Sequence, residues 1–176
     1  MAACLSCHNK AITKDGRTIP SVNDEIAAAK CIHGPIRDED CGACHDAHAS
    51  GQPALLLAEH PAKFYAPFSP EVYGLCFQCH DQALAAELQT KSATSFRNGT
   101  LNLHALHVNN KVKGRTCRAC HAPHGSALPH LIRAYAPFGP GRWPLPVRFQ
   151  ETRTGGACAP GCHLPKAYDR ETPVKE

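Results

Sequence analysis

The sequence predicts a chain that is mostly coil with short α-helices and little or no β-structure. Fifteen prolines and thirteen glycines interrupt its 176 residues, and both residue types end regular elements. No stretch alternates apolar and polar residues convincingly enough to predict a half-buried strand. Leu, Ile, Val and Phe together supply 32 residues, about 18%, which is too few for a chain to build its own apolar core. Apolar material from another source must complete the interior.

The expected helices are short and follow local start signals. Ser21 is a suitable N-cap for the segment SVNDEIAAAK, and prolines or polar residues bound the others. Four segments are expected to be helical: residues 21–30, residues 53–60, residues 81–89 and the turn around His104. The proline-rich stretch at residues 137–147 is expected to be extended, because a residue before proline disfavours the helical conformation.

Ten of the eleven cysteines fall into five short clusters, each ending in the dipeptide Cys-His. Two thiols at this spacing can add across two vinyl groups at one edge of a porphyrin, and the adjacent imidazole can ligate the iron. The pattern therefore predicts five haem c groups. The thioether cysteines are Cys4, Cys7, Cys41, Cys44, Cys76, Cys79, Cys117, Cys120, Cys158 and Cys162. The proximal iron ligands are His8, His45, His80, His121 and His163.

Other uses of cysteine explain the clusters less well. A zinc or iron–sulfur site would need two Cys-x-x-Cys pairs and no histidine at a fixed offset, and five pairs do not divide into twos. A disulfide framework would leave the histidines unexplained. The fifth cluster, CAPGCH, carries one extra residue, and Pro160-Gly161 is a turn pair that can loop out. Cys31 is left over and is expected to be a buried thiol, with an intermolecular disulfide as the alternative.

The second axial position of each iron must come from the remaining histidines. Met1 is the only methionine and stands at the terminus, so His/Met ligation is not expected. Seven histidines remain: His33, His48, His60, His104, His107, His124 and His130. Every haem can therefore be bis-histidine and low-spin. This surplus argues against the open iron that a haem enzyme would keep, so the sequence predicts no enzyme, and an oxyanion-reducing haem is the less favoured alternative.

An internal repeat appears when residues 33–80 are laid over residues 107–163. Each copy contains an upstream histidine, a CxxCHxxHxS segment, a YAPF segment and a second Cys-His cluster. We therefore expect a single multihaem domain over residues 1–176, because such repeats stack to bury a shared interior. Its parts are a one-haem leader (1–32), a first two-haem module (33–106), a second two-haem module (107–170) and a tail (171–176).

Three histidine pairs share a spacing of three residues, in the segments at His45, His104 and His121. Residues three apart project from neighbouring points of a helical turn. If the two members of a pair bind different irons, the two haems become close neighbours. His60 and His130 also match each other, five residues before the tyrosine of YAPF. They rank last as ligands, and if either binds iron, His104 is the assignment most open to replacement.

The two CxxCHxxHxS segments, the YAPF segments, residues 94–126 and the closing GGACAPGCHLP resemble the doubled CXXCH multihaem cytochromes. The resemblance covers most of residues 31–170. It implies a multihaem cytochrome c fold organised around a chain of closely packed haems. It also implies a distal ligand set of His33, His48, His104, His107 and His124. The family includes periplasmic carriers, and related small multihaem proteins include subunits of extracellular filaments.

Electron transfer is the function that these observations predict. About 35 residues per haem cannot cover every porphyrin, so haem edges should be exposed for contact with other haem proteins. We expect a homo-polymeric subunit of an extracellular cytochrome filament, or nanowire. The alternative is a discrete periplasmic pentahaem carrier that donates electrons to a terminal reductase or to other redox proteins.

Charge and hydropathy limit the partners and the compartment. The polypeptide charge of +4 becomes about −1 once haem propionates and ferric irons are counted, so nucleic-acid binding is not supported. No run of eighteen apolar residues predicts a transmembrane segment. Cys4 leaves no room for a signal peptide ahead of it in this sequence. A mature, exported chain in the periplasm or outside the cell is expected.

Overall fold

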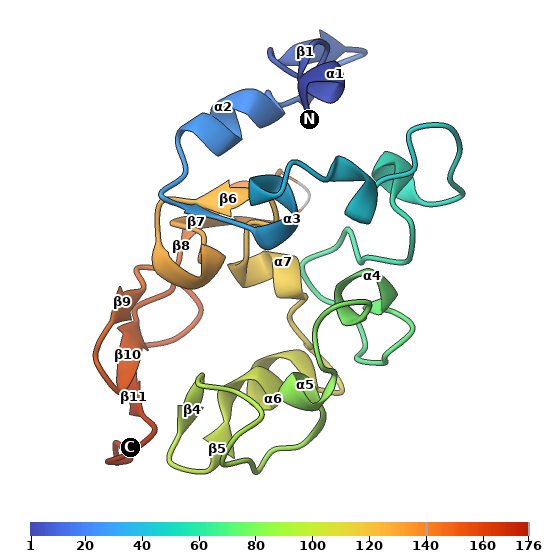
Figure 1. Ribbon diagram of the computed structural model, residues 1–176. Helices are drawn as coiled ribbons and strands as arrows, with labels where there is room; N and C mark the ends of the chain where they lie inside the picture. The colour runs from blue at the N-terminus through green and yellow to red at the C-terminus, as the bar shows by residue number, and fades with distance from the viewer. Residues whose placement is uncertain (140, 176) are drawn as a thin grey trace.

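The structure is a computed structural model that describes residues 1–139 and 141–175. Its regular elements are short, and long connections link them (Figure 1). The described chain holds seven α-helices and eleven strands. The leader lies at one end of the molecule in Figure 1, and the C-terminal strands lie near the other.

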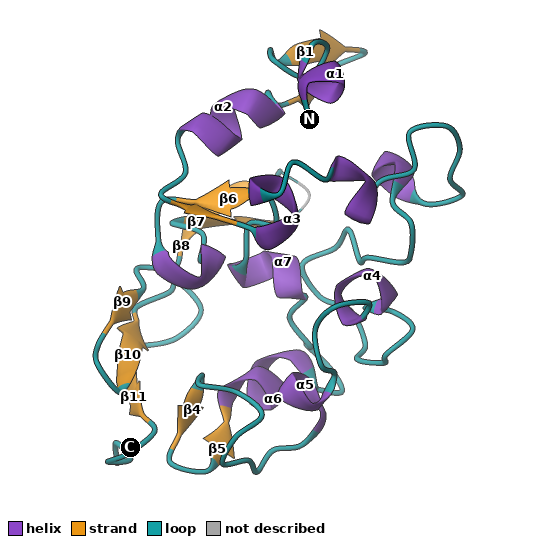
Figure 2. Ribbon diagram, in the orientation of Figure 1, coloured by secondary structure: helices purple, strands orange, loops and turns teal. Residues whose placement is uncertain are grey.

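The expectation of little or no β-structure is wrong. The strands form five small antiparallel sheets within the described residues, four of two strands and one of three (Figure 2). Each strand is only two to four residues long, which is too short for an alternating pattern to develop in the sequence. Most of the sheets are local hairpins, and one joins segments far apart in the chain.

The leader contains two helices and one hairpin. Helix α1 covers Ala2–Leu5, strands β1 (Ile12–Lys14) and β2 (Arg17–Ile19) pair, and helix α2 covers Val22–Ala27. The Ser21 hydroxyl accepts a hydrogen bond of 3.0 Å from the Asp24 amide. Ser21 therefore caps α2 as the sequence predicted, satisfying an amide that has no partner in the first helical turn.

The next segment is built around the second and third cysteine clusters. It contains β3 (Cys31–Ile32), α3 (Gly34–Arg37), the 3₁₀ turns η1 (Cys41–Ala43) and η2 (Pro53–Leu55), and α4 (Gly74–Phe77). The helix expected over residues 53–60 is wrong. Ala54 and Leu55 have positive φ angles of 57° and 55°, and the Leu57 amide donates to the Cys44 carbonyl. Tertiary hydrogen bonds to the cysteine cluster therefore override local helix propensity here.

The middle of the chain contains the helix that carries His104 and His107. Helix α5 covers Ala83–Ala86, strands β4 (Arg97–Asn98) and β5 (Leu101–Asn102) pair, and α6 covers Leu103–Val108. The Asn102 side chain caps α6 by accepting from the Ala105 amide at 3.2 Å. Asn102 is completely buried and also donates to the Leu84 and Glu87 carbonyls, so it ties α6 to the α5 segment.

Helix α7 (Cys117–Cys120) leads into β6 (Gly125–Ser126) and the 3₁₀ turn η3 (Pro129–Leu131). Strand β6 pairs with β3, with Cys31 opposite Ser126 and Ile32 opposite Gly125. This sheet joins the end of the leader to the second half of the chain. A Cβ atom on Gly125 would lie 2.6 Å from the Ala29 Cβ, so only glycine allows the two backbones to approach this closely.

The regular elements of the C-terminal third are mostly strands. Strand β7 (Tyr135–Phe138) pairs with β8 (Trp143–Pro146), and β10 (Gly155–Cys158) lies between β9 (Gln150–Glu151) and β11 (Lys166–Asp169). The extended conformation expected over residues 137–147 is found only in part, at the end of β7 and in β8, because Gly139 and Arg142 have positive φ angles of 68° and 50° and the Arg142 amide donates to the Gly139 carbonyl. Pro140 of that stretch and Glu176 of the predicted tail lie outside the described residues.

The polypeptide buries very little apolar volume of its own. Among the described residues the buried apolar side chains are Tyr73, Ala85, Ala105, Val108, Ala119, Ala122, Ala136 and Val147. Five of these eight are alanines. One small cluster forms around Tyr73, with Phe68 and Phe77 packed against its ring. Backbone hydrogen bonds and caps, rather than a continuous core, hold the elements in place.

Candidate functional site

Four of the five attachment histidines face a second imidazole from elsewhere in the chain. The ring centroids of each pair are separated by nearly the same distance. The pairs are His80 with His33 at 6.1 Å, His121 with His104 at 6.3 Å, His45 with His124 at 6.4 Å, and His163 with His107 at 6.5 Å. Every pair combines a histidine of a cysteine cluster with one of the predicted distal histidines.

This spacing fits an iron held between two imidazoles. A metal–imidazole bond is about 2 Å long, so two such bonds place the ligating nitrogens about 4 Å apart. Each ring centre lies about 1 Å behind its nitrogen, which gives a centroid separation of about 6 Å. The donor set therefore fits a bis-histidine haem.

The other nitrogen of these rings is already engaged, which leaves Nε2 for a metal. Nδ1 contacts a backbone carbonyl in four rings: His45 at 2.9 Å, His121 at 2.9 Å, His107 at 2.7 Å and His163 at 2.6 Å. A carbonyl only accepts hydrogen bonds, so Nδ1 carries the proton and Nε2 keeps its lone pair. Ligating histidines almost always have such a partner, which fixes tautomer and ring orientation.

The carbonyl that accepts the Nδ1 hydrogen bond of a proximal histidine belongs to the same kind of turn in both halves of the chain. His45 donates to Ala54 and His121 donates to His130, each nine residues ahead. Both acceptors lie in a 3₁₀ turn with two consecutive positive φ angles. Ser50 and Ser126 stabilise these turns by donating to the Leu56 and Ile132 carbonyls, respectively. The serine of CxxCHxxHxS thus shapes the turn that orients the proximal ligand.

These contacts correct the repeat alignment at one position. His130 occupies the place of Ala54 in the first half of the chain, rather than that of His60. The side chain of His130 lies 2.7 Å from the Glu151 carboxylate through Nε2. His60 is half-buried and lies near the Cys76 thiol, whose pKa it helps to lower. Neither ring faces an attachment histidine in the part of the chain that the structure describes.

Two short elements position the opposing histidines. Strand β3 ends just before His33, and its partner β6 begins just after His124. The His33 amide donates to the His124 carbonyl at 3.3 Å. These two rings therefore serve neighbouring clusters. Helix α6 carries His104 and His107 on adjacent points of one turn, and they face the fourth and fifth clusters. Both arrangements cross the boundaries of the predicted modules.

Burial keeps several of these rings uncharged. It lowers the pKa of His104 to about 4, with the charges of His121 and His107 adding to the effect. Burial is also the largest cause of the lowered pKa of His33, His107 and His121. A neutral imidazole is the form that ligates a metal, so the local environment favours the ligating state at neutral pH.

The cysteine clusters lie next to one another in sequence order. The Cys41 thiol lies close enough to Cys4 to affect its pKa, and the Cys76 thiol lies close enough to Cys117 to do the same. Electrostatic contacts connect the remaining neighbours, from Cys44 to Cys76 and Cys79 and from Cys120 to Cys158 and Cys162. Groups attached to these thiols would be adjacent from the first cluster to the fifth.

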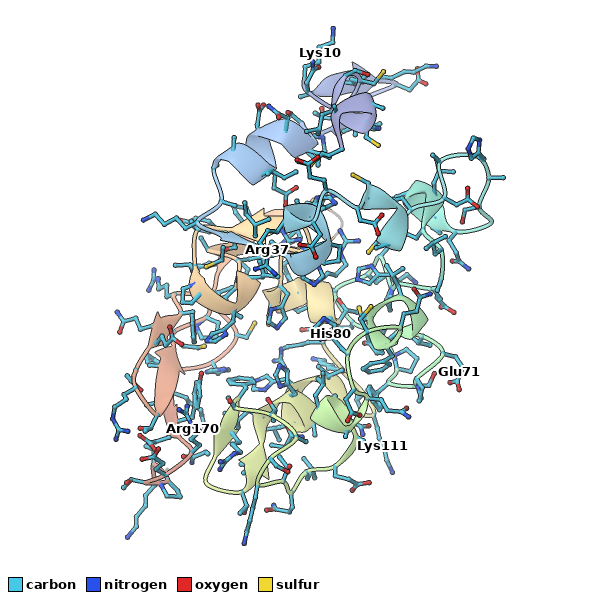
Figure 3. The ribbon with its side chains drawn as sticks, in the orientation of Figure 1. Lys10, Arg37, Glu71, His80, Lys111 and Arg170 are labelled. Atoms are coloured by element: carbon cyan, nitrogen blue, oxygen red, sulfur yellow. The ribbon has the colours of Figure 1, made fainter. Side chains whose placement is uncertain are left out.

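The third cluster borders an open depression in the surface. Its volume is about 460 Å³, and Phe77, Gln78, His80 and Asp81 are among the lining residues. In Figure 3 the His80 side chain lies in the middle of the molecule, between the α4 and α7 segments. The first cluster differs, because His8 and the predicted distal residue His48 are both exposed and face no second imidazole among the described residues.

In the described residues no three His, Cys, Asp or Glu side chains gather as a site for a bare metal ion. None of the eleven thiols there is in a disulfide, and Cys31 is partly exposed instead of buried. No helix of the described chain is both long and apolar enough to cross a membrane.

Paired thiols lie beside imidazoles that are opposed in pairs, and each pair can ligate one iron from both faces. These features define a protein that binds haem c covalently. The family model for the doubled CXXCH motif matches residues 33–85 and 109–138. The chain belongs to this family of multihaem c-type cytochromes, whose haems transfer electrons and which are typically exported. Neither the curated proteins nor the solved structures gave a match.

The sequence did not indicate the residues that orient the distal ligands. Glu25 Oε2 lies 3.0 Å from Nδ1 of His124, and the Thr94 hydroxyl lies 2.9 Å from Nδ1 of His104. The hydrogen bond from His124 is the largest cause of the lowered pKa of Glu25. Glu25 is 99 residues from its partner, so no local pattern could connect them. Ser50 and Ser126 could have been found, because both stand at one position of the repeated motif.

Proposed function

We propose that the chain carries five haem c groups and serves as a subunit of an extracellular electron-conducting filament. Four haems take both axial ligands from this chain. Their ligand pairs are His45 with His124, His80 with His33, His121 with His104, and His163 with His107. The common centroid spacing of 6.1–6.5 Å supports these assignments.

The order of the thiol contacts supports a continuous path for electrons. Adjacent clusters approach one another from Cys4–Cys41 at one end to Cys120–Cys158 at the other. Haems attached at these cysteines would be neighbours, and this arrangement would let an electron pass from each haem to the next. The chain has no catalytic role in this proposal, because its residues only hold the haems.

One observation favours a filament over a discrete carrier. Among the described residues His8 faces no second imidazole and His48 faces no attachment histidine, and both residues are exposed. One incomplete ligand set and one unused ligand on the surface of the same chain are complementary. His48 of a second copy completes the haem of His8, and repetition of this contact produces a polymer.

The test combines electron microscopy with the ferric absorption spectrum of the haem-loaded protein. We expect long filaments and a fully low-spin spectrum from the native chain. The variant His48→Ala should give discrete particles with one high-spin haem per chain, because the His8 haem loses its second ligand. His130→Ala, which removes another exposed histidine, is the matched control and should leave filaments intact.

The alternatives predict different results for the native chain. Discrete low-spin particles at every concentration would support a soluble periplasmic carrier and overturn the filament. Discrete particles that retain a high-spin haem and reduce a small oxyanion such as nitrite would instead support an enzyme. In that case, His48→Ala would change neither the spectrum nor the particle size.

A further inference from the structure

Glu25 gives one of the opposed histidine pairs a carboxylate partner, and in the described part of the chain no other pair has one. Its carboxylate oxygen Oε2 is 3.0 Å from Nδ1 of His124, the histidine that faces His45. The two side chains are largely shielded from solvent, with exposed fractions of 31% for Glu25 and 26% for His124. Since a carboxylate accepts and cannot donate, Nδ1 of His124 supplies the proton.

The corresponding partners of six of the other seven rings are neutral groups. His45, His107, His121 and His163 contact backbone carbonyls through Nδ1, and His104 contacts the Thr94 hydroxyl. His33 is hydrogen-bonded to the Pro123 backbone. The second His–carboxylate contact of the described chain, between His130 and Glu151, involves Nε2 of a ring that faces no attachment histidine. Glu25 is therefore distinctive among these contacts.

The fold holds this contact from both sides. Ser21 caps the helix that carries Glu25, and the Lys30 amide donates to the Ser126 carbonyl at 3.0 Å just after that helix. Gly125, next to His124, permits the close approach of Ala29, as a Cβ at position 125 would lie 2.6 Å from the Ala29 Cβ. The one-cluster leader is thus fixed against the second half of the chain at the residue that orients His124.

We propose that Glu25 lowers the reduction potential of the haem attached at Cys41 and Cys44, by accepting the Nδ1 proton of its distal ligand His124. A carboxylate partner raises the basicity of a ligating imidazole. A more basic ligand stabilises the ferric form relative to the ferrous form, because the ferric iron carries one more positive charge. The couple is a one-electron reduction by an external donor, and the Nδ1 proton remains shared between His124 and Glu25 throughout.

This inference rests on the pairing of His45 with His124 but not on whether the protein forms filaments. Its consequence is an uneven potential along the chain of haems, with a step up in energy at the second cluster. An electron that enters from the first cluster would therefore spend less time on this haem than on its neighbours. Glu25 is a positioning and tuning residue in this account, since it does not contact the iron.

The test is a spectroelectrochemical titration of the haem-loaded variant Glu25→Gln. The amide retains the size of the carboxylate and removes its charge. We expect one of the one-electron steps to move to higher potential by about a tenfold change in its equilibrium constant, equivalent to about 59 mV for one electron. The remaining steps should move much less, and the spectrum should stay low-spin.

Two further variants separate the hydrogen bond from its alternatives. Asp24→Asn removes the same charge from the neighbouring position of helix α2 and should leave that step nearly unchanged. Glu25→Asp keeps the charge and should shift the step less than Glu25→Gln. An equal shift in Asp24→Asn and Glu25→Gln, or no shift in Glu25→Gln, would overturn the proposal. A high-spin haem in Glu25→Gln would also overturn it, since Glu25 would then only hold His124 in place.

Discussion

At the scale of single residues, the second nitrogen of each imidazole separates the histidines that can ligate iron from those that cannot. His45, His107 and His121 direct Nδ1 to a backbone carbonyl and so present Nε2 with its lone pair. His130 instead uses Nε2 for a carboxylate and faces no attachment histidine in the described chain. The immediate neighbours of each histidine thus assign different roles to twelve chemically identical side chains.

The pairing of His33 with His80 leads to a prediction about spin state. The variant His33→Ala should convert one haem per chain from low to high spin, because the iron above His80 loses its second imidazole. The ferric absorption spectrum and electron paramagnetic resonance measure the conversion. His60→Ala removes a similarly half-buried histidine and should remain low-spin. If His60→Ala gave the high-spin haem and His33→Ala did not, the ligand assignment would be reversed.

At the scale of elements, the repeated turn after each CxxCHxxHxS segment controls the orientation of a proximal ligand. Its carbonyl accepts from the attachment histidine, and its serine hydroxyl accepts from an amide two residues ahead, namely Gln52 or Leu128. Two left-handed residues in succession are costly for non-glycine side chains. The surrounding hydrogen bonds offset this cost, so the turn depends on its serine.

Ser126→Ala should therefore destabilise the protein by about 1–2 kcal/mol, since the substitution removes the donor to the Ile132 carbonyl and the acceptor of the Leu128 amide. Denaturant unfolding of the haem-loaded protein measures this change. Ser6→Ala is the control, because Ser6 is exposed and its hydroxyl contacts only nearby residues, the Ala3 carbonyl and the Cys7 sulfur. Equal stability of Ser126→Ala and the native chain would show that the turn does not need its hydroxyl.

At the scale of the whole molecule, haem must supply most of the apolar interior. The buried apolar residues of the described chain are mainly alanines, and the one small aromatic cluster lies around Tyr73. Large apolar side chains such as Trp143 and Leu164 are 74% and 82% exposed. Conformational entropy opposes folding at about 1–2 kcal/mol per residue, and this small buried surface cannot offset it.

We therefore expect the chain produced without haem attachment to be largely unfolded. Far-ultraviolet circular dichroism of protein made in cells that lack the attachment machinery measures this, with the haem-loaded protein as the control. The metal-dependent folding of small domains provides the physical precedent. A cooperative thermal transition in the haem-free chain would show that the polypeptide folds on its own.

How much of the protein could be predicted depends on the distance over which each feature is encoded. The cysteine clusters, their adjacent histidines and the caps at Ser21 and Asn102 are local patterns. The first of these establishes the haem-binding class that the family match confirms. The helix expected at residues 53–60 failed, because hydrogen bonds to the second cluster impose left-handed residues there. The small sheets were missed because strands of two to four residues have no readable period.

The sequence by itself determined that this chain binds haem c, since thioether attachment requires thiols and an imidazole within a few residues of one another. It also limited the second ligands to a few histidines. Only the tertiary structure decided which histidine faces which cluster, because those partners come together through a two-residue sheet and one short helix. The same holds for Glu25 and His124, which lie 99 residues apart. Attachment is local chemistry, whereas coordination across a haem joins distant parts of the chain.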